Sequence, residues 1–199
     1  MEKRIDDVFS ETVKSYENIL KRYYPSHGSN GFTERNITFN FSHNYLAKNE
    51  KAIIWQECPL KDGKHFDTLI IDDEKEAIII VEAKRLQNEK KLESVVNDFN
   101  RINEYSSEIK LDDNRLTYRK YGLLLIDVWI SKTKGSEDIR AKLLNKLNLG
   151  TLDKDTIFPK QVDLDYTDYS EKYHLAYKLF SVDKQNALGS NTRLCSLAG

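Results

Sequence analysis

Residues 65–84, HFDTLIIDDEKEAIIIVEAK, contain two apolar runs separated by a short charged segment. Runs of this kind, divided by turn-forming residues such as those at 72–76, predict two strands joined in a hairpin. The uninterrupted apolar run at 77–81 is typical of a strand buried on both faces, as in a sheet that helices cover on each side. We therefore expect an α/β fold, a three-layer sandwich with a central mixed β-sheet that contains this hairpin.

Three charged residues lie on the predicted hairpin. Asp67 is on the first strand, and Glu82 and Lys84 end the second. Side chains two residues apart point to the same face of a strand, so Glu82 and Lys84 share a face. A turn centred on residues 74–75 would bring Asp67 beside Glu82. Because buried charges need a partner or a metal ion, these three residues are candidates for a functional site.

Position, more than residue type, makes Glu82 and Lys84 informative. An acid two residues before a lysine also occurs at positions such as 62 and 64, as chance provides in a chain with 32% charged residues, but only Glu82 follows an uninterrupted apolar run. Two carboxylates and an ammonium group suit metal-dependent phosphodiester cleavage. Carboxylate oxygens bind hard divalent cations, and a bound metal ion activates water and neutralises developing phosphate charge.

Asp67, followed by Glu82-Ala83-Lys84 after an apolar strand, resembles the motif of the PD-(D/E)xK nuclease superfamily. The resemblance implies the restriction-endonuclease-like fold. Its core is a helix, three antiparallel strands, a second helix and a further strand (αβββαβ). The resemblance covers about residues 30–130 and implies a magnesium-dependent endonuclease or exonuclease.

The resemblance also implies a role for each motif residue. Asp67, Glu82 and the backbone carbonyl of Ala83 would bind Mg²⁺, for which Mn²⁺ substitutes. Lys84 would orient or deprotonate the attacking water and help to neutralise the phosphate. The chain departs from the motif at Phe66, where the family usually has a proline that shapes the strand without binding metal.

An additional acid facing the site from the first core helix is common in this superfamily, and Glu34 is the candidate by resemblance. Apolar residues at helical spacing predict a helix over 33–48, with Thr33 as the N-cap and Glu34 on the buried stripe. Alternatively, a glutamate in a first helical turn only interacts favourably with the helix dipole. Glu57, which ends a predicted strand at 52–57, is a rival, or simply an exposed residue at a strand end.

Gln87 is the last candidate catalytic residue. It follows Lys84 by three residues, where many relatives place a polar residue that orients water or phosphate. A polar residue that merely begins the second core helix is an equal alternative. Other periodic segments predict further elements: helices at 2–24, 87–108 and 136–147, a strand at 121–130, and a strand at 173–180 at or near a sheet edge.

Composition favours one nuclease-like domain over residues 1–199. A chain of 23.2 kDa can bury a normal core without disulfides. Cys58 and Cys195 are far apart in sequence and fit the reduced thiols of a cytoplasmic protein. No apolar run reaches membrane-spanning length, and no signal peptide is expected. Residues 185–199 are expected to be flexible or to dock on a partner.

The charge balance limits how the chain can bind nucleic acid. Its net charge of −1 offers little of the basic surface on which nonspecific binding depends. Local candidates for contact with nucleic acid, expected to be DNA, are Lys84, Arg85, Arg119 and Lys120. The weak positive character suggests a small substrate footprint, a homodimer or help from a partner protein.

Two interpretations other than an active nuclease stay open. The chain could be a catalytically inactive nuclease-fold protein that binds nucleic acid or another protein. Asp67, Glu82 and Lys84 could also form a buried ion-pair cluster in an unrelated α/β domain, an arrangement that is costly unless every charge is paired. The presence of all three motif residues favours the enzyme.

Overall fold

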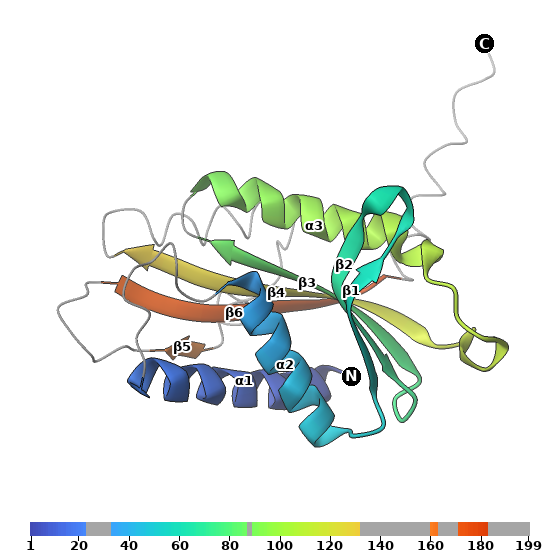
Figure 1. Ribbon diagram of the computed structural model, residues 1–199, viewed down its shortest axis with the longest axis horizontal. Coiled ribbons are helices and arrows are strands. Elements are labelled where there is room, and N and C mark those ends of the chain that lie inside the picture. The colour runs from blue at the N-terminus through green and yellow to red at the C-terminus, as the bar shows by residue number, and fades with distance from the viewer. Residues whose placement is uncertain (23–32, 87–88, 132–159, 163–170, 183–199) are drawn as a thin grey trace, which may run out of the picture.

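Figure 1 shows the computed structural model, which describes residues 1–22, 33–86, 89–131, 160–162 and 171–182. Its helices are α1 (Glu2–Arg22), α2 (Glu34–Lys48) and α3 (Leu92–Tyr105). Its strands are β1 (Ile53–Pro59), β2 (His65–Asp72), β3 (Ala77–Leu86), β4 (Arg119–Ser131), β5 (Lys160–Val162) and β6 (Glu171–Ser181). The helix predicted at 136–147, the segment 185–199 and Gln87 lie outside the described residues.

Across the described part of the chain, the strands form one six-stranded sheet in the order β1-β2-β3-β4-β6-β5. β3 and β4 are parallel, whereas the other neighbouring pairs are antiparallel. Parallel neighbours need a crossover connection, and α3 lies within the one that joins β3 to β4. The prediction of an α/β fold with a mixed sheet is confirmed. The strand predicted at 173–180 is β6, next to the short outer strand β5.

The predicted hairpin is β2 and β3, near the centre of the sheet. Its register pairs Thr68 with Val81 and Asp72 with Ala77. Every residue from Ala77 to Ala83 is buried, as the apolar run predicts for a strand covered on both faces. The charged residues 73–76 form the turn between the two strands, where their side chains are exposed to water.

Helices cover both faces of the sheet. One hydrophobic cluster packs α1 and α2 against one face and includes Phe9, Phe41 and Ile79. The second packs α3 against the opposite face and includes Val95 and Ile80. Figure 1 shows α3 on one side of the strands and α1 with α2 on the other. Among the described helices, none is long and apolar enough to cross a membrane.

A buried carboxylate, Asp72, fastens the C-terminal end of α2 to the hairpin. The Tyr45 hydroxyl donates to Asp72 Oδ2 at 2.5 Å, and Asn49 Nδ2 donates to Oδ1 at 2.9 Å. Burial and this hydrogen bond raise the pKa of Tyr45, so the phenol keeps its proton and stays a donor. A buried charge must be satisfied, and a helix is stiff. Anchoring one end of α2 therefore helps to position Glu34 at the other.

We predict that Tyr45→Phe lowers the free energy of unfolding by about 1.5–3 kcal/mol, the usual effect of removing a hydrogen bond to a buried charged group. Tyr118→Phe is a matched control, because the Tyr118 hydroxyl donates at 3.1 Å to Asp73, an exposed acid in the hairpin turn. The Tyr118→Phe substitution should lower the free energy of unfolding by less than about 0.5 kcal/mol. Chemical denaturation at neutral pH measures both, and equal losses would contradict the anchoring role of Asp72.

A candidate active site at the end of the β2–β3 hairpin

The two carboxylates of the motif lie beside each other where regular strand pairing stops. Thr68 and Val81 are the last pair of the β2–β3 ladder at this end. The next opposed positions are Asp67 and Glu82, and opposed side chains share a face. Asp67 Oδ2 accepts a hydrogen bond of 2.7 Å from the backbone N–H of Ala83. A side chain therefore continues the hydrogen bonding of the hairpin where the backbone ladder ends.

Glu82 is the most deeply buried acid of this group, with a side chain that is 0% exposed. Arg101 on α3 holds both of its oxygens, from Nε to Oε1 at 2.9 Å and from Nη2 to Oε2 at 2.5 Å. Burial raises the pKa of Glu82 to about 8 despite these hydrogen bonds, and the charge of Asp67 contributes. A carboxyl group that exchanges its proton near neutral pH is typical of functional sites.

Lys84 lies between two further acids. Its Nζ is 3.2 Å from Asp98 Oδ2 and 3.5 Å from Glu34 Oε2, and its side chain is 19% exposed. Burial lowers the pKa of Lys84, but the charges of Asp98 and Glu34 outweigh burial, so the net shift is upward. The ammonium group therefore stays protonated and is held in one place.

Glu34 reaches the site from the first turn of α2. Its Oε1 accepts a hydrogen bond of 3.1 Å from the backbone N–H of Arg85, and Oε2 faces Lys84. The turn begins at Thr33, whose backbone N–H donates to the Asn36 side chain at 2.6 Å. This local hydrogen bond starts the helix where Glu34 can reach the end of β3.

Glu57, the rival accessory acid, lies outside this cluster. Its side chain is 46% exposed and binds His65 Nε2 at 2.8 Å and Arg35 Nε at 3.4 Å. The backbone of Glu57 has a φ of 52°, a left-handed conformation that turns the side chain out of the regular strand pattern. Of the two acids considered from sequence, Glu34 is the one beside Lys84.

Two residues of the cluster, Asp98 and Arg101, were missed by sequence reasoning. Asp98 is buried, and Arg101 Nη2 lies 3.0 Å from Asp98 Oδ1. Burial raises the pKa of Asp98, although Lys84 and Arg101 oppose the shift. A signal was present, because Asp98 lies between Val95 and Ile102 on the buried stripe of α3. An acid on an apolar stripe calls for a buried partner.

The other residues predicted to contact nucleic acid, Arg85, Arg119 and Lys120, do not form an exposed basic surface beside the cluster. Arg85 is only 7% exposed, so it offers little surface to a ligand. Arg119 and Lys120 pair with the start of β3, at Ala77 and Ile78. They lie about five residues along the strand from Glu82, roughly 16 Å away. The parallel register thus sends both to the opposite end of the sheet.

The cluster has the chemistry of a divalent-cation site, but its oxygens are already engaged. Its carboxylates offer the oxygen ligands that Mg²⁺ prefers. Lys84 and Arg101 bind three of them, Glu34, Glu82 and Asp98. Over the described ranges, no group of three or more acidic, histidine or cysteine residues is arranged to hold a metal ion. A cation could bind here by replacing these positive charges, a rearrangement of side chains and not of the fold.

We predict that the raised pKa of Glu82 makes stability depend on pH. The folded state binds this proton more tightly than the unfolded chain. The stabilisation is therefore complete below pH 4.5 and is lost as the pH rises to about 8. Glu82→Gln cannot ionise, so its stability relative to wild type should increase over that interval, by at most about 1.4 kcal/mol per pH unit.

Chemical denaturation from about pH 5 to about pH 8 tests this expectation. The matched control is Glu50→Gln, at an exposed position, and its stability relative to wild type should change less with pH than that of Glu82→Gln. If the Glu82→Gln curve were parallel to wild type, Glu82 would titrate like an ordinary surface acid.

Comparison of the chain with known proteins finds no matching family model, no matching curated protein and no matching solved structure. The resemblance to the nuclease superfamily therefore rests on the motif residues.

Proposed function

We propose that the protein is a metal-dependent nuclease with a restriction-endonuclease-like core that hydrolyses phosphodiester bonds in nucleic acid, with DNA as the expected substrate. The observation that carries the proposal is the meeting of Asp67, Glu82, Lys84 and Glu34 at the end of one hairpin. The order of elements from α2 to β4 is helix, three strands, helix and strand, which agrees with the core that the motif implies.

The acids of the cluster would hold the metal ion. Bound Mg²⁺ supplies an activated water and positive charge against the phosphate. Asp67, Glu82 and the backbone carbonyl of Ala83 are the oxygens proposed to bind it, and Glu34 would steady that ion or bind a second. The high pKa of Glu82 adds a condition, because metal ligands must be deprotonated. Metal affinity should therefore rise with pH towards 8.

Lys84 is suited to act on the phosphate. Its ammonium group is held by acids on α2 and α3 and is protonated before substrate arrives. A fixed positive charge in a partly buried site stabilises negative charge that develops during phosphoryl transfer. A metal ion bound by the carboxylates would weaken their hold on Lys84, and its ammonium group would then be available to the phosphate or the attacking water.

The test of the proposal is cleavage. Purified protein should nick plasmid DNA or cut single-stranded DNA with Mg²⁺ or Mn²⁺, and EDTA should stop the reaction. Absence of Mn²⁺ binding in calorimetry, together with no cleavage across DNA and RNA substrates, would contradict a nuclease.

We predict that Lys84→Ala lowers turnover by about 10²-fold or more, the scale of losing a charge-stabilising or proton-transfer group. Mn²⁺ affinity should change little, because a lysine ammonium is not a metal ligand. Lys14→Ala is the control, since Lys14 is an exposed lysine of α1 paired with Glu11, and this variant should keep wild-type turnover. Full activity in Lys84→Ala would remove Lys84 from the mechanism.

We also predict that Glu34→Gln weakens Mn²⁺ binding whereas Glu57→Gln leaves it unchanged. Both substitutions remove one carboxylate charge, but only Glu34 lies beside Lys84 and the end of β3. Calorimetric titration of the two variants compares them directly. The reverse result would transfer the accessory role to Glu57.

A second candidate is a nuclease-fold protein that binds nucleic acid or a protein partner without cutting. The ion pair between Arg101 and Glu82 favours it, because one guanidinium satisfies both carboxylate oxygens and takes the place that a metal ion would need. Mn²⁺ calorimetry separates the two functions. An enzyme binds the ion and loses it in Glu82→Gln, whereas a scaffold of this kind binds none.

A further inference from the structure

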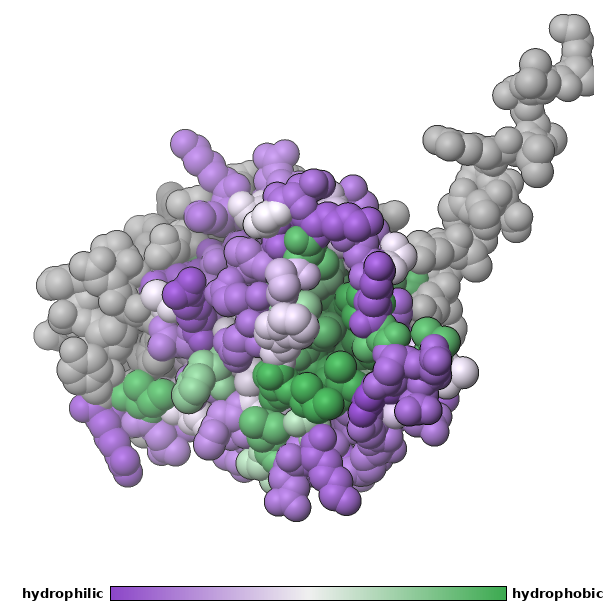
Figure 2. All heavy atoms as spheres, turned by 45° about the vertical axis from the view of Figure 1, so that its right-hand side comes forward, coloured by the Kyte–Doolittle hydropathy of each residue, from purple (hydrophilic) through white to green (hydrophobic). Residues whose placement is uncertain are grey.

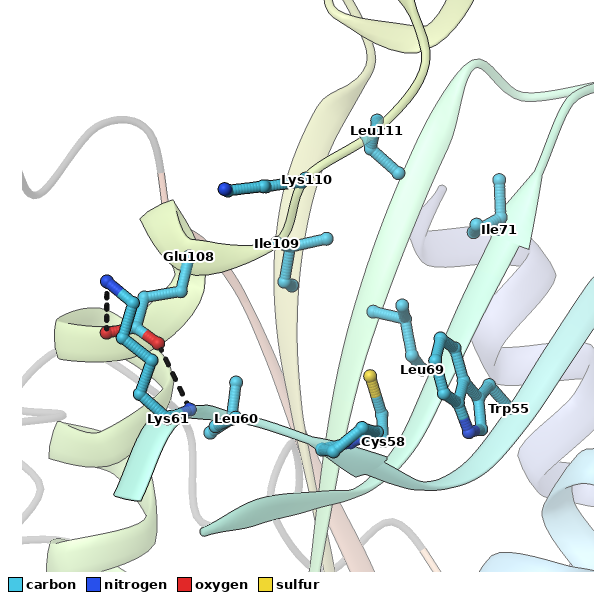
Figure 3. Close-up of a pocket in the computed structure, with 11 residues that line it drawn as sticks. Trp55, Cys58, Leu60, Lys61, Leu69, Ile71, Glu108, Ile109, Lys110 and Leu111 are labelled. Atoms are coloured by element: carbon cyan, nitrogen blue, oxygen red, sulfur yellow. Dashed lines mark hydrogen bonds and ion pairs between the residues drawn. The ribbon is translucent and has the colours of Figure 1, made fainter. Parts of the chain in front are cut away.

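An apolar groove of about 460 Å³ lies between the β1–β2 hairpin and the segment that follows α3. Figure 3 shows Trp55 and Leu69 from the strands on one side, with Ile109 and Leu111 opposite. Trp55 is 54% exposed, although large aromatic side chains are usually covered. In Figure 2, hydrophobic side chains gather near the middle of the molecule and hydrophilic ones surround them. An apolar surface with a polar rim is typical of a binding site.

One side of α3 connects the groove to the candidate active site. Arg101 and Tyr105 are four residues apart on α3, so they follow one another along that side. Glu108 ends the short 3-10 helix that comes directly after α3. Arg101 binds Glu82 in the site, Tyr105 contacts a lysine of the β1–β2 connection, and Glu108 binds Lys61 at the groove. At about 1.5 Å per residue of α-helix and about 2 Å per residue of 3-10 helix, Arg101 and Glu108 are roughly 12 Å apart along the helix axis, the rise of about three to four stacked nucleotides.

Lysines line this path. Lys64 Nζ lies 4.3 Å from the centre of the Tyr105 ring. Lys61 has a side chain that is 74% exposed, and Lys110 stands beside the groove in Figure 3. Sites for single-stranded nucleic acid combine such cations, which follow the backbone, with aromatic side chains on which bases stack. Trp55 supplies the aromatic surface, and the lysines supply the charge complementary to phosphate.

We propose that the groove binds an unpaired base of single-stranded nucleic acid, stacked on Trp55, while the backbone passes Lys61 and Lys64 towards the candidate active site. This inference rests on the proposed nuclease function and deepens it, because it names single-stranded DNA or RNA as the substrate class. An intact duplex keeps its bases stacked inside and presents no base face to the groove.

Binding of short fluorescent oligonucleotides, followed by anisotropy in EDTA, tests the inference without any cleavage. Trp55→Ala should weaken binding of a single strand by about 5- to 150-fold, the range for loss of base–aromatic stacking. Trp55→Phe should keep most of the affinity, and duplex binding should change little. Phe39→Ala is the matched control, because Phe39 is an aromatic residue of α2 that is 63% exposed and does not line the groove.

A lysine variant adds a second readout. Lys61→Ala should weaken single-strand binding and lower its salt dependence by about one phosphate contact. Parallel titrations with DNA and RNA of the same sequence show which sugar is preferred. No single-strand binding by wild type, or single-strand affinity unchanged in Trp55→Ala, would overturn the inference.

This inference and the nuclease proposal fail in different ways. Trp55-dependent binding without cleavage in Mg²⁺ or Mn²⁺ would contradict the nuclease and leave the base-binding groove intact. Metal-dependent cleavage that is equally fast in Trp55→Ala and wild type, with equal single-strand affinity, would contradict the base-binding groove and leave the nuclease proposal intact.

Discussion

The buried carboxylate of Glu82 is the constraint on which the arrangement of the site depends. It lies at the end of the central hairpin with no exposed surface, and a buried carboxyl group is unfavourable without hydrogen-bond partners. Arg101 supplies these partners from α3 through two hydrogen bonds, beside the apolar residues with which the helix packs on the sheet. The same helix places Asp98 beside Lys84. The Arg101–Glu82 contact therefore joins the hairpin to the crossover helix at the point where the side chains of the site meet.

Acids outnumber bases in the cluster, and this excess of carboxyl groups is what could attract protons or a metal ion. Four carboxylates, those of Glu34, Asp67, Glu82 and Asp98, face the two cations Lys84 and Arg101. Negative charge in surplus and out of water favours the uptake of protons or of a cation. The raised pKa values of Glu82 and Asp98 mean that these acids hold protons more tightly than exposed acids do. The proposed function requires that a divalent ion bind to these acids in place of the protons.

The site and the groove are linked by strand register as well as by α3. Trp55 pairs with Leu69, and Leu69 is two residues along β2 from Asp67. Residues two apart on a strand share a face, so the exposed tryptophan and the motif acid follow one surface of the sheet. The placement suits a ligand that extends along the strands, with one end at the acids and the other on an aromatic ring.

The sequence by itself determined the hairpin and the helices around it, because strand and helix periods and turn residues act over a few neighbouring positions. It left Glu34 and Glu57 as alternatives for the accessory acid. Asp67 and Glu82 met because they are symmetric about the turn. Only the tertiary structure decided that Arg101 and Asp98 complete the cluster and that Arg119 and Lys120 lie far from it. It also assembled the groove, from segments around residues 55–61, 69–71 and 108–111. These outcomes depend on helix crossover and parallel register, which are set by packing between distant segments.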